Sequence, residues 1–232
     1  TGGIALRLGH TVAAFEPSPA ALAAVLDDGT RIDAGFAIVG RGVRPNSGLA
    51  QASGLACGPK GHILVDEHMR TSDPDIYAAG DAVEVVDRVF GGQTAIPLAG
   101  PANKQGRVAA DNMTGRPSSY RGSLGASIVK VGGLTAASIG WTAARLRAAK
   151  KDFRVVYVHP SSGASYYPGA MPLSLKLLYS PEGRILGAQA VGASGADKRI
   201  DVIATAIQAG MNVRELAELE LAYAPPFGSA KD

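Results

Sequence analysis

The chain has 232 residues, enough for one large domain or two modest ones. Apolar residues make up 46% and charged residues 19%, a globular balance that excludes a disordered chain. The net charge of +3 comes without a long basic run, so nucleic-acid binding is not expected. The single cysteine excludes a disulfide framework and a multi-cysteine zinc site within this sequence. Because no run of 18 apolar residues occurs, we expect a soluble cytoplasmic protein that makes no membrane contact.

The first residue is Thr1 rather than methionine, and the glycine-rich stretch after it reads as a strand already under way. We expect the C-terminal part of a longer polypeptide. A processed mature protein is the alternative.

The first region, residues 1–47, predicts short β-strands. Residues 11–16 and 22–26 are strand-like, and the Asp-Asp-Gly-Thr sequence at 27–30 predicts a hairpin turn. The continuous apolar run at 36–39 predicts a buried strand.

The second region, residues 48–118, contains a predicted strand at 61–66 and an apolar strand over 76–81 that ends on Gly-Asp. A helix is predicted over 101–113, where Gly115 and Pro117 then stop it.

The third region, residues 119–232, reads as α+β, with an antiparallel sheet covered on one face by helices. A helix from Ala196 to about Gly210 turns Ile200 and Ile203 inward, and Asn212 with Glu215 predicts a capping box. The other predicted elements are strands at 127–131 and 154–158, a short helix that contains residues 141–149, and a hairpin of 173–179 with 185–191.

Gly80 and Asp81 form the first candidate site. Ligands of α/β folds bind beyond the carboxyl ends of strands, and glycine lets a ligand approach the backbone. The carboxylate of Asp81 would accept hydrogen bonds from ligand hydroxyls. An ordinary turn is the alternative.

The sequence TSDPDIYAAGD at 71–81 resembles the second FAD-binding motif of the pyridine nucleotide–disulfide oxidoreductases. The resemblance implies that Asp81 binds a ribityl hydroxyl of FAD. AIPLAGPANKQGR at 95–107 resembles the family helix that begins at the flavin pyrimidine ring, which places the backbone of Leu98 and Ala99 there. Free N–H groups at a helix start would stabilise anionic charge on reduced flavin. A plain loop-to-helix junction is the alternative.

Three further sequences resemble the dimerisation domain of coenzyme A–disulfide reductases and the related NADH oxidases and peroxidases. They are ASYYPGA at 164–170, GADKRID at 195–201 and AYAPPFGSAKD at 222–232. The resemblance implies that Tyr166, Tyr223 and Lys231 contact substrate across a homodimer, and that Phe227 lies near the partner's flavin. Interface packing is the alternative for the tyrosines.

The chain contains no GxGxxG turn, although the family uses one for FAD and one for NAD(P)H. The family's redox-active cysteine belongs to the N-terminal FAD segment. Cys57 has no adjacent activating group in the sequence, so we assign no catalytic residue to this chain and expect it to be inactive alone. The four histidines show no metal-binding spacing.

The sequence predicts an α/β plus α+β architecture. The resemblance to the family implies that residues 1–47 are the tail of an NAD(P)H-binding domain, residues 48–118 the second segment of an FAD-binding domain, and residues 119–232 a dimerisation domain. The intact enzyme would use FAD and NAD(P)H to reduce a small disulfide such as coenzyme A disulfide. An NADH oxidase or peroxidase, a persulfide reductase, or a non-catalytic dimerisation or binding module are the alternatives.

Overall fold

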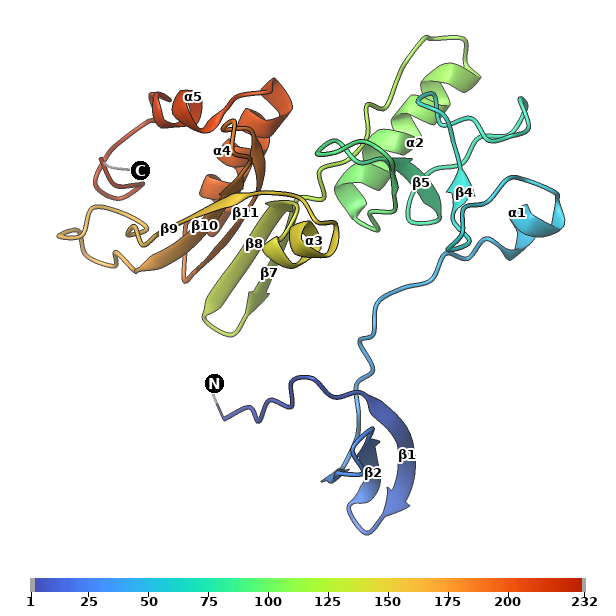
Figure 1. Ribbon diagram of the computed structural model, residues 1–232, viewed down its shortest axis with the longest axis horizontal. Coiled ribbons are helices and arrows are strands. Elements are labelled where there is room, and N and C mark those ends of the chain that lie inside the picture. Colours follow the sequence, from blue (N-terminus) through green and yellow to red (C-terminus); the bar gives the residue numbers. More distant parts are fainter. Residues whose placement is uncertain (1–2, 231–232) are drawn as a thin grey trace. The chain divides into compact units, whose positions relative to one another are not determined.

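The computed structural model describes residues 3–230 and divides the chain into two compact units, Thr1–Val43 and Arg44–Asp232 (Figure 1). Each unit is described by itself below. Within residues 3–230, no helix has the length and apolar character needed to cross a membrane.

The first unit is a three-stranded antiparallel sheet in the order β1-β2-β3. The strands predicted at residues 11–16 and 22–26 and the hairpin turn are confirmed, and Ala23 and Leu26 of the central strand are buried. His10 Nδ1 lies 2.9 Å from Asp27 Oδ1, and this hydrogen bond lowers the pKa of Asp27. The strands are β1 (Val12–Ser18), β2 (Ala21–Leu26) and β3 (Arg31–Ala34).

The buried strand predicted at residues 36–39 is wrong. The segment has no strand assignment, and Ile38 is 87% exposed. An apolar run becomes a buried strand only when neighbouring strands satisfy its backbone, and the unit offers these residues none.

The second unit begins with a small three-stranded sheet, in the order β4-β5-β6, followed by a long helix. The helix confirms the prediction, although it begins two residues earlier. The elements are α1 (Gly48–Ala52), β4 (Ile63–Leu64), β5 (Val83–Val86), β6 (Gln93–Thr94) and α2 (Ala99–Met113).

The strand predicted over residues 76–81 is also wrong. Tyr77 makes only an isolated bridge with Arg70, and the strand proper, β5, starts at Val83. Gly80 has a φ of +92°, which interrupts an extended segment, so Gly80 and Asp81 lie in a turn before the strand instead of at its end.

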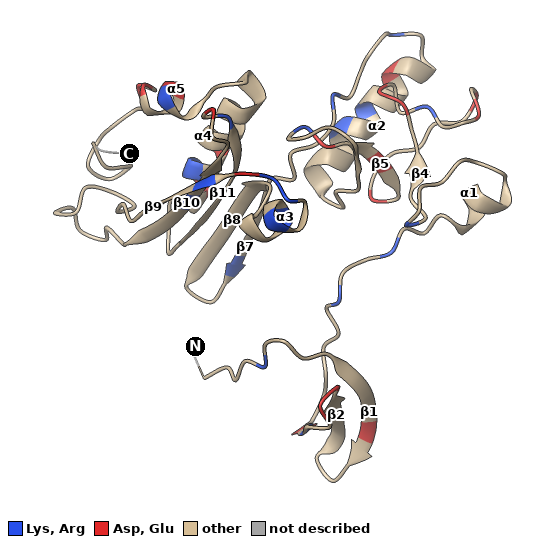
Figure 2. Cartoon of the chain, viewed as in Figure 1, with Lys and Arg blue, Asp and Glu red and all other residues tan. Residues whose placement is uncertain are grey.

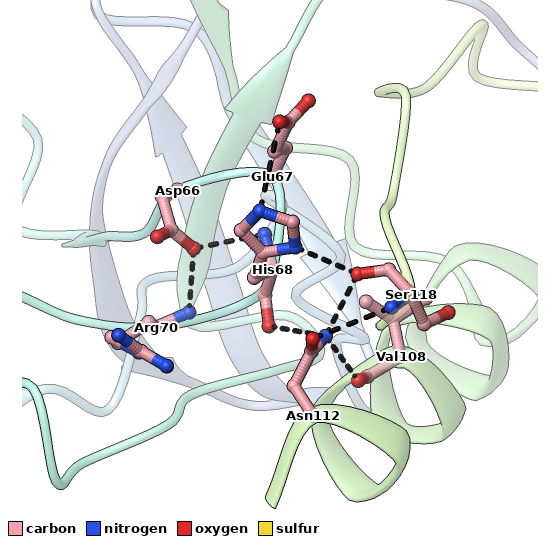
Figure 3. Close-up of polar contacts among 7 residues, drawn as sticks. All are labelled: Asp66, Glu67, His68, Arg70, Val108, Asn112 and Ser118. Atoms are coloured by element: carbon pink, nitrogen blue, oxygen red, sulfur yellow. Dashed lines mark hydrogen bonds and ion pairs between the residues drawn. The ribbon is translucent and has the colours of Figure 1, made fainter. Parts of the chain in front are cut away.

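A polar network fixes the turn at residues 66–70 against the end of α2 (Figure 3). Asp66 Oδ1 accepts the backbone N–H groups of His68 (2.8 Å) and Arg70 (2.9 Å). Asn112 Nδ2 donates to the carbonyls of Val108 and Ser118, both at 2.8 Å, and His68 Nδ1 lies 2.8 Å from the same Ser118 carbonyl.

This network holds Met69 in the left-handed region, with φ of +63°. Its side chain is buried in a cluster with Val83, Val85 and Val108. Burial of that side chain and the hydrogen bonds around the turn offset the strain that a non-glycine residue suffers there.

The rest of the second unit is built on a five-stranded antiparallel sheet in the order β7-β8-β11-β10-β9. The predicted strands, hairpin and helices are confirmed, and Asn212 with Glu215 forms the capping box. The elements are β7 (Ser127–Val131), β8 (Leu134–Gly140), α3 (Ala143–Ala148), β9 (Arg154–Val158), β10 (Leu173–Tyr179), β11 (Ile185–Gly192), α4 (Ala196–Ala209) and α5 (Val213–Ala217).

Both faces of this sheet carry core, rather than the single covered face that we expected. Helix α4 covers one face, where Ile200 and Ile203 pack with residues of β8, β10 and β11. A second hydrophobic cluster lies on the other face, where Leu146 of α3 packs with Leu178 and Leu186. Residue alternation along a strand sends neighbouring side chains to opposite faces, which explains how β10 and β11 serve both clusters.

A buried carboxylate joins the two parts of the second unit. Asp87 is 3% exposed, and its Oδ2 accepts Trp141 Nε1 at 2.7 Å and Arg145 Nη2 at 2.8 Å. Its Oδ1 accepts the N–H of Val89 at 2.8 Å. The Arg145 guanidinium also lies 4.0 Å over the Trp141 ring. These contacts fix the end of β5 against β8 and α3.

Replacing Asp87 by alanine is expected to lower the free energy of unfolding by about 3 kcal/mol, because Trp141 and Arg145 lose a buried acceptor. Urea titration followed by the fluorescence of the single tryptophan measures the change. The exposed Asp152→Ala variant is the control and should change stability by less than about 0.5 kcal/mol. Equal losses in both variants would contradict the assigned role.

Candidate functional site

The turn at Gly80 and Asp81 is held by a buried side chain of α2. The amide of Gln105 is 2% exposed, and its Oε1 accepts the N–H of Gly80 at 2.8 Å. The residues before the turn are anchored as well, because the N–H of Ala78 donates to the carbonyl of Met69 at 3.0 Å. The carboxylate of Asp81 therefore stands on a fixed backbone, exposed beside α2.

The start of α2 presents unused hydrogen-bond donors. Leu98 occupies the N-cap in an extended conformation and provides no side-chain cap. The N–H of Ala102 bonds to Leu98, Pro101 has no N–H, and those of Ala99 and Gly100 have no acceptor among the described residues. This end of a 15-residue helix therefore offers two backbone donors to an anionic or carbonyl group.

The predicted substrate residues lie on two loops that a backbone contact joins. The N–H of Ala164 donates to the carbonyl of Pro225 at 2.8 Å. Gly163 permits this approach, since a Cβ there would lie 2.7 Å from the same Pro225 oxygen. A residue larger than glycine would push the loops apart.

The two loops bring Tyr166 and Tyr223 together, although 57 residues separate them in sequence. A hydrogen bond to Tyr166 raises the pKa of Tyr223 above its ordinary value, with partial burial as the second cause. That direction is expected when the Tyr223 hydroxyl donates, because ionisation would lose the bond. Tyr166 is still 75% exposed and Tyr223 49% exposed, so both residues remain open to a ligand.

Phe227 lies on the same C-terminal loop and is 69% exposed. Its backbone carbonyl accepts Lys198 Nζ from the first turn of α4 at 3.1 Å, which ties the loop to the helix. The predicted Lys231 lies outside the described residues.

The sequence-predicted residues thus form two separate groups. The Gly80 turn and the start of α2 make one, and the tyrosine loops with Phe227 make the other. No hydrogen bond among the described residues joins the two groups, and in Figure 1 the tyrosine loops lie at the end of the five-stranded sheet away from α2. Cys57 belongs to neither; its Sγ lies 3.6 Å from the carbonyl of Leu55.

Two supporting residues escaped the sequence analysis. Gln105 could have been found from the sequence, because it is a polar residue on the same face of the predicted helix as the apolar Val108 and Ala109. No local pattern marks Lys198, whose partner is 29 residues away.

Two family models match this chain. Residues 1–106 match the model described as pyridine nucleotide-disulphide oxidoreductase, and residues 126–232 match the dimerisation domain of the same family. The chain belongs to the pyridine nucleotide-disulphide oxidoreductase family, which confirms the resemblance.

The chain is also similar to individual members of this family. An NADH oxidase of Methanocaldococcus jannaschii is 36% identical over 88% of this chain and 45% of its own length. A coenzyme A disulfide reductase of Staphylococcus aureus (strain JH9) is 39% identical over 84% of this chain and 44% of its own length. The structure of a NAD-dependent persulfide reductase from A. fulgidus matches with a TM-score of 0.91 and 42% identity, over 96% of this chain and 42% of that one. The chain therefore spans less than half the length of these relatives.

The residues present fit the ring and ribityl portion of a flavin. A free carboxylate at Asp81 matches ribityl hydroxyls, and the unused N–H groups at the start of α2 match the electron-rich edge of the flavin ring. Nothing in the chain matches the glycine turn needed for the pyrophosphate.

Replacing Tyr166 by phenylalanine is expected to lower the pKa of Tyr223 toward its ordinary value of 10.0, because the neutral Tyr223 hydroxyl loses its acceptor. A pH titration of ¹³Cζ-labelled tyrosine by NMR measures this. Tyr167→Phe, one residue along the same loop, is the matched control. An unchanged Tyr223 pKa in Tyr166→Phe would refute the pairing.

Proposed function

We propose that the chain is the C-terminal part of an FAD-dependent NAD(P)H:disulfide oxidoreductase of the coenzyme A disulfide reductase type. Its contribution is part of the FAD site, a dimer interface and substrate contacts across that interface. The observation that carries this proposal is the joining of the two exposed loops that hold Tyr166 and Tyr223, through the 2.8 Å hydrogen bond from the N–H of Ala164 to the carbonyl of Pro225. Similarity to a coenzyme A disulfide reductase supports the choice of a small disulfide as substrate.

In this proposal residues 1–47 end an NAD(P)H-binding domain, residues 48–118 form the second segment of an FAD-binding domain, and residues 119–232 form the dimerisation domain. A cytoplasmic location is also proposed, since that compartment keeps small thiols reduced.

The bound FAD would accept a hydride from NAD(P)H and pass two electrons on toward the disulfide. This chain's own residues would hold and orient it. Asp81 would accept the ribityl hydroxyls, and the N–H groups of Ala99 and Gly100 would stabilise negative charge on the ring. Gln105 would hold the Gly80 turn in place through its bond to the N–H of Gly80, and so would position Asp81 for the ribityl hydroxyls.

A homodimer is proposed because the two groups of site residues are separate within one chain. A second copy would bring its Tyr166, Tyr223 and Phe227 to the flavin, where the two hydroxyls would orient a disulfide. The five-stranded sheet also carries exposed apolar side chains that a partner would cover; they include Ile128, Val129, Val131 and Val158.

Reduction of oxygen or of a persulfide is the second candidate, and the similarities to an NADH oxidase and to a persulfide reductase favour it. The intact protein discriminates these candidates by its relative kcat/KM for coenzyme A disulfide, a persulfide and oxygen.

In the intact dimer, Tyr223→Phe is expected to lower kcat/KM for disulfide reduction roughly two- to twelve-fold, the cost of one uncharged hydrogen bond. The NADH-to-flavin half-reaction, followed at the flavin absorbance band, should be unchanged. Stopped-flow and steady-state kinetics separate the two steps.

Tyr157→Phe, on β9, is the matched control. Light scattering should give twice the subunit mass for all three proteins. If Tyr223→Phe instead lowers Tm by many degrees with substrate kinetics intact, Tyr223 is a packing residue and the substrate role is wrong.

A further inference from the structure

A cationic cleft lies in the second unit and borders the start of α2 at Gly100. Its volume is about 390 Å³, within the ~300–1,000 Å³ typical of small-molecule sites. Three basic side chains line it, from Arg88, Lys104 and Arg121. Of the residues proposed to hold flavin, Gly100 lines the cleft, whereas Asp81, Leu98 and Ala99 do not, and neither do the tyrosines of the two loops.

The positive charge of the cleft is not neutralised by the protein. No acidic residue lines the cleft, and among residues 3–230 none of the three basic groups has a carboxylate within 4.0 Å. The nearest carboxylate in sequence, that of Asp87, is occupied by Trp141 and Arg145. In Figure 2 the basic bands of α2 lie near its middle, and its acidic band lies near its end.

The walls of the cleft are held in place by backbone contacts. The N–H of Ser123 donates to Val86 at 2.9 Å, and the N–H of Arg88 donates back to Ser123 at 3.1 Å. Gly122 allows this contact, since a Cβ there would lie 2.2 Å from the Val86 carbonyl oxygen. The segments that carry Arg88 and Arg121 are therefore fixed side by side.

We propose that this cleft binds a small ligand through a phosphate group. Two guanidinium groups supply planar donors that match phosphate oxygens, and Lys104 adds a mobile point charge. Arg88 Nη1 lies 3.5 Å from Gln208 Oε1, a weak contact that leaves its other donors for a ligand. Ser119 and Tyr120 also line the cleft, and residues that carry hydroxyl groups suit the polar remainder of such a ligand.

Isothermal titration of the 232-residue chain with inorganic pyrophosphate at low salt tests this site. We expect saturable one-site binding, with NMR shifts centred on residues 119–126. Arg88→Gln combined with Arg121→Gln should weaken binding at least about tenfold, because two charge-assisted contacts are lost.

The single Lys104→Gln variant, at an exposed position, gives a second reading if the double variant fails to fold, and it should also weaken binding. Lys130→Gln, an equal charge change on β7, is the control and should bind as the unaltered chain does. Absent saturation, an equal response to sodium chloride at matched ionic strength, or equal weakening in the control would each overturn the proposal.

Discussion

The buried carboxylate of Asp87 is the contact on which the arrangement of the second unit depends. It collects an indole N–H, a guanidinium and a backbone N–H in one place, and thereby fixes the end of β5 against β8 and α3. The cluster of Val89 with Leu146, Leu178 and Leu186 is built beside it. An unpaired carboxylate at this depth would be costly, so the fold retains Asp87 only together with its partners.

Two kinds of contact hold the loops of the candidate site in place. Side chains of helices fix loops, as the buried Gln105 does for Gly80 and the half-buried Lys198 does for the carbonyl of Phe227. A glycine lets backbones meet, as Gly163 does at Pro225. The groups proposed to touch ligand, Asp81 and the tyrosines, are left exposed on these supported loops, which is how binding residues are commonly presented.

Sequence patterns predicted the elements that carry strong local signals. The hairpin at 27–30, the capping box at Asn212 and the apolar face of α4 are examples, because their determinants lie within a few residues of one another. The sequence analysis missed β8, since its small residues Thr135, Ala136, Ala137 and Ser138 gain strand character only from pairing with β7 and β11. The apolar run at 36–39 predicted a buried strand wrongly, because no neighbouring strand pairs with it. The Gln105 contact could not be predicted, because it joins residues that are 25 positions apart and meet only in the folded chain.

The central claim is that Asp81 and the start of α2 hold flavin in the intact protein. The most direct measurement is the FAD dissociation constant of the intact protein with Asp81→Ala, beside the control Asp75→Ala, which alters an exposed acid of the same segment. Loss of hydrogen bonds to a charged group predicts about tenfold or greater weakening for Asp81→Ala and no change for the control. Equal FAD affinity in the two variants would contradict the account.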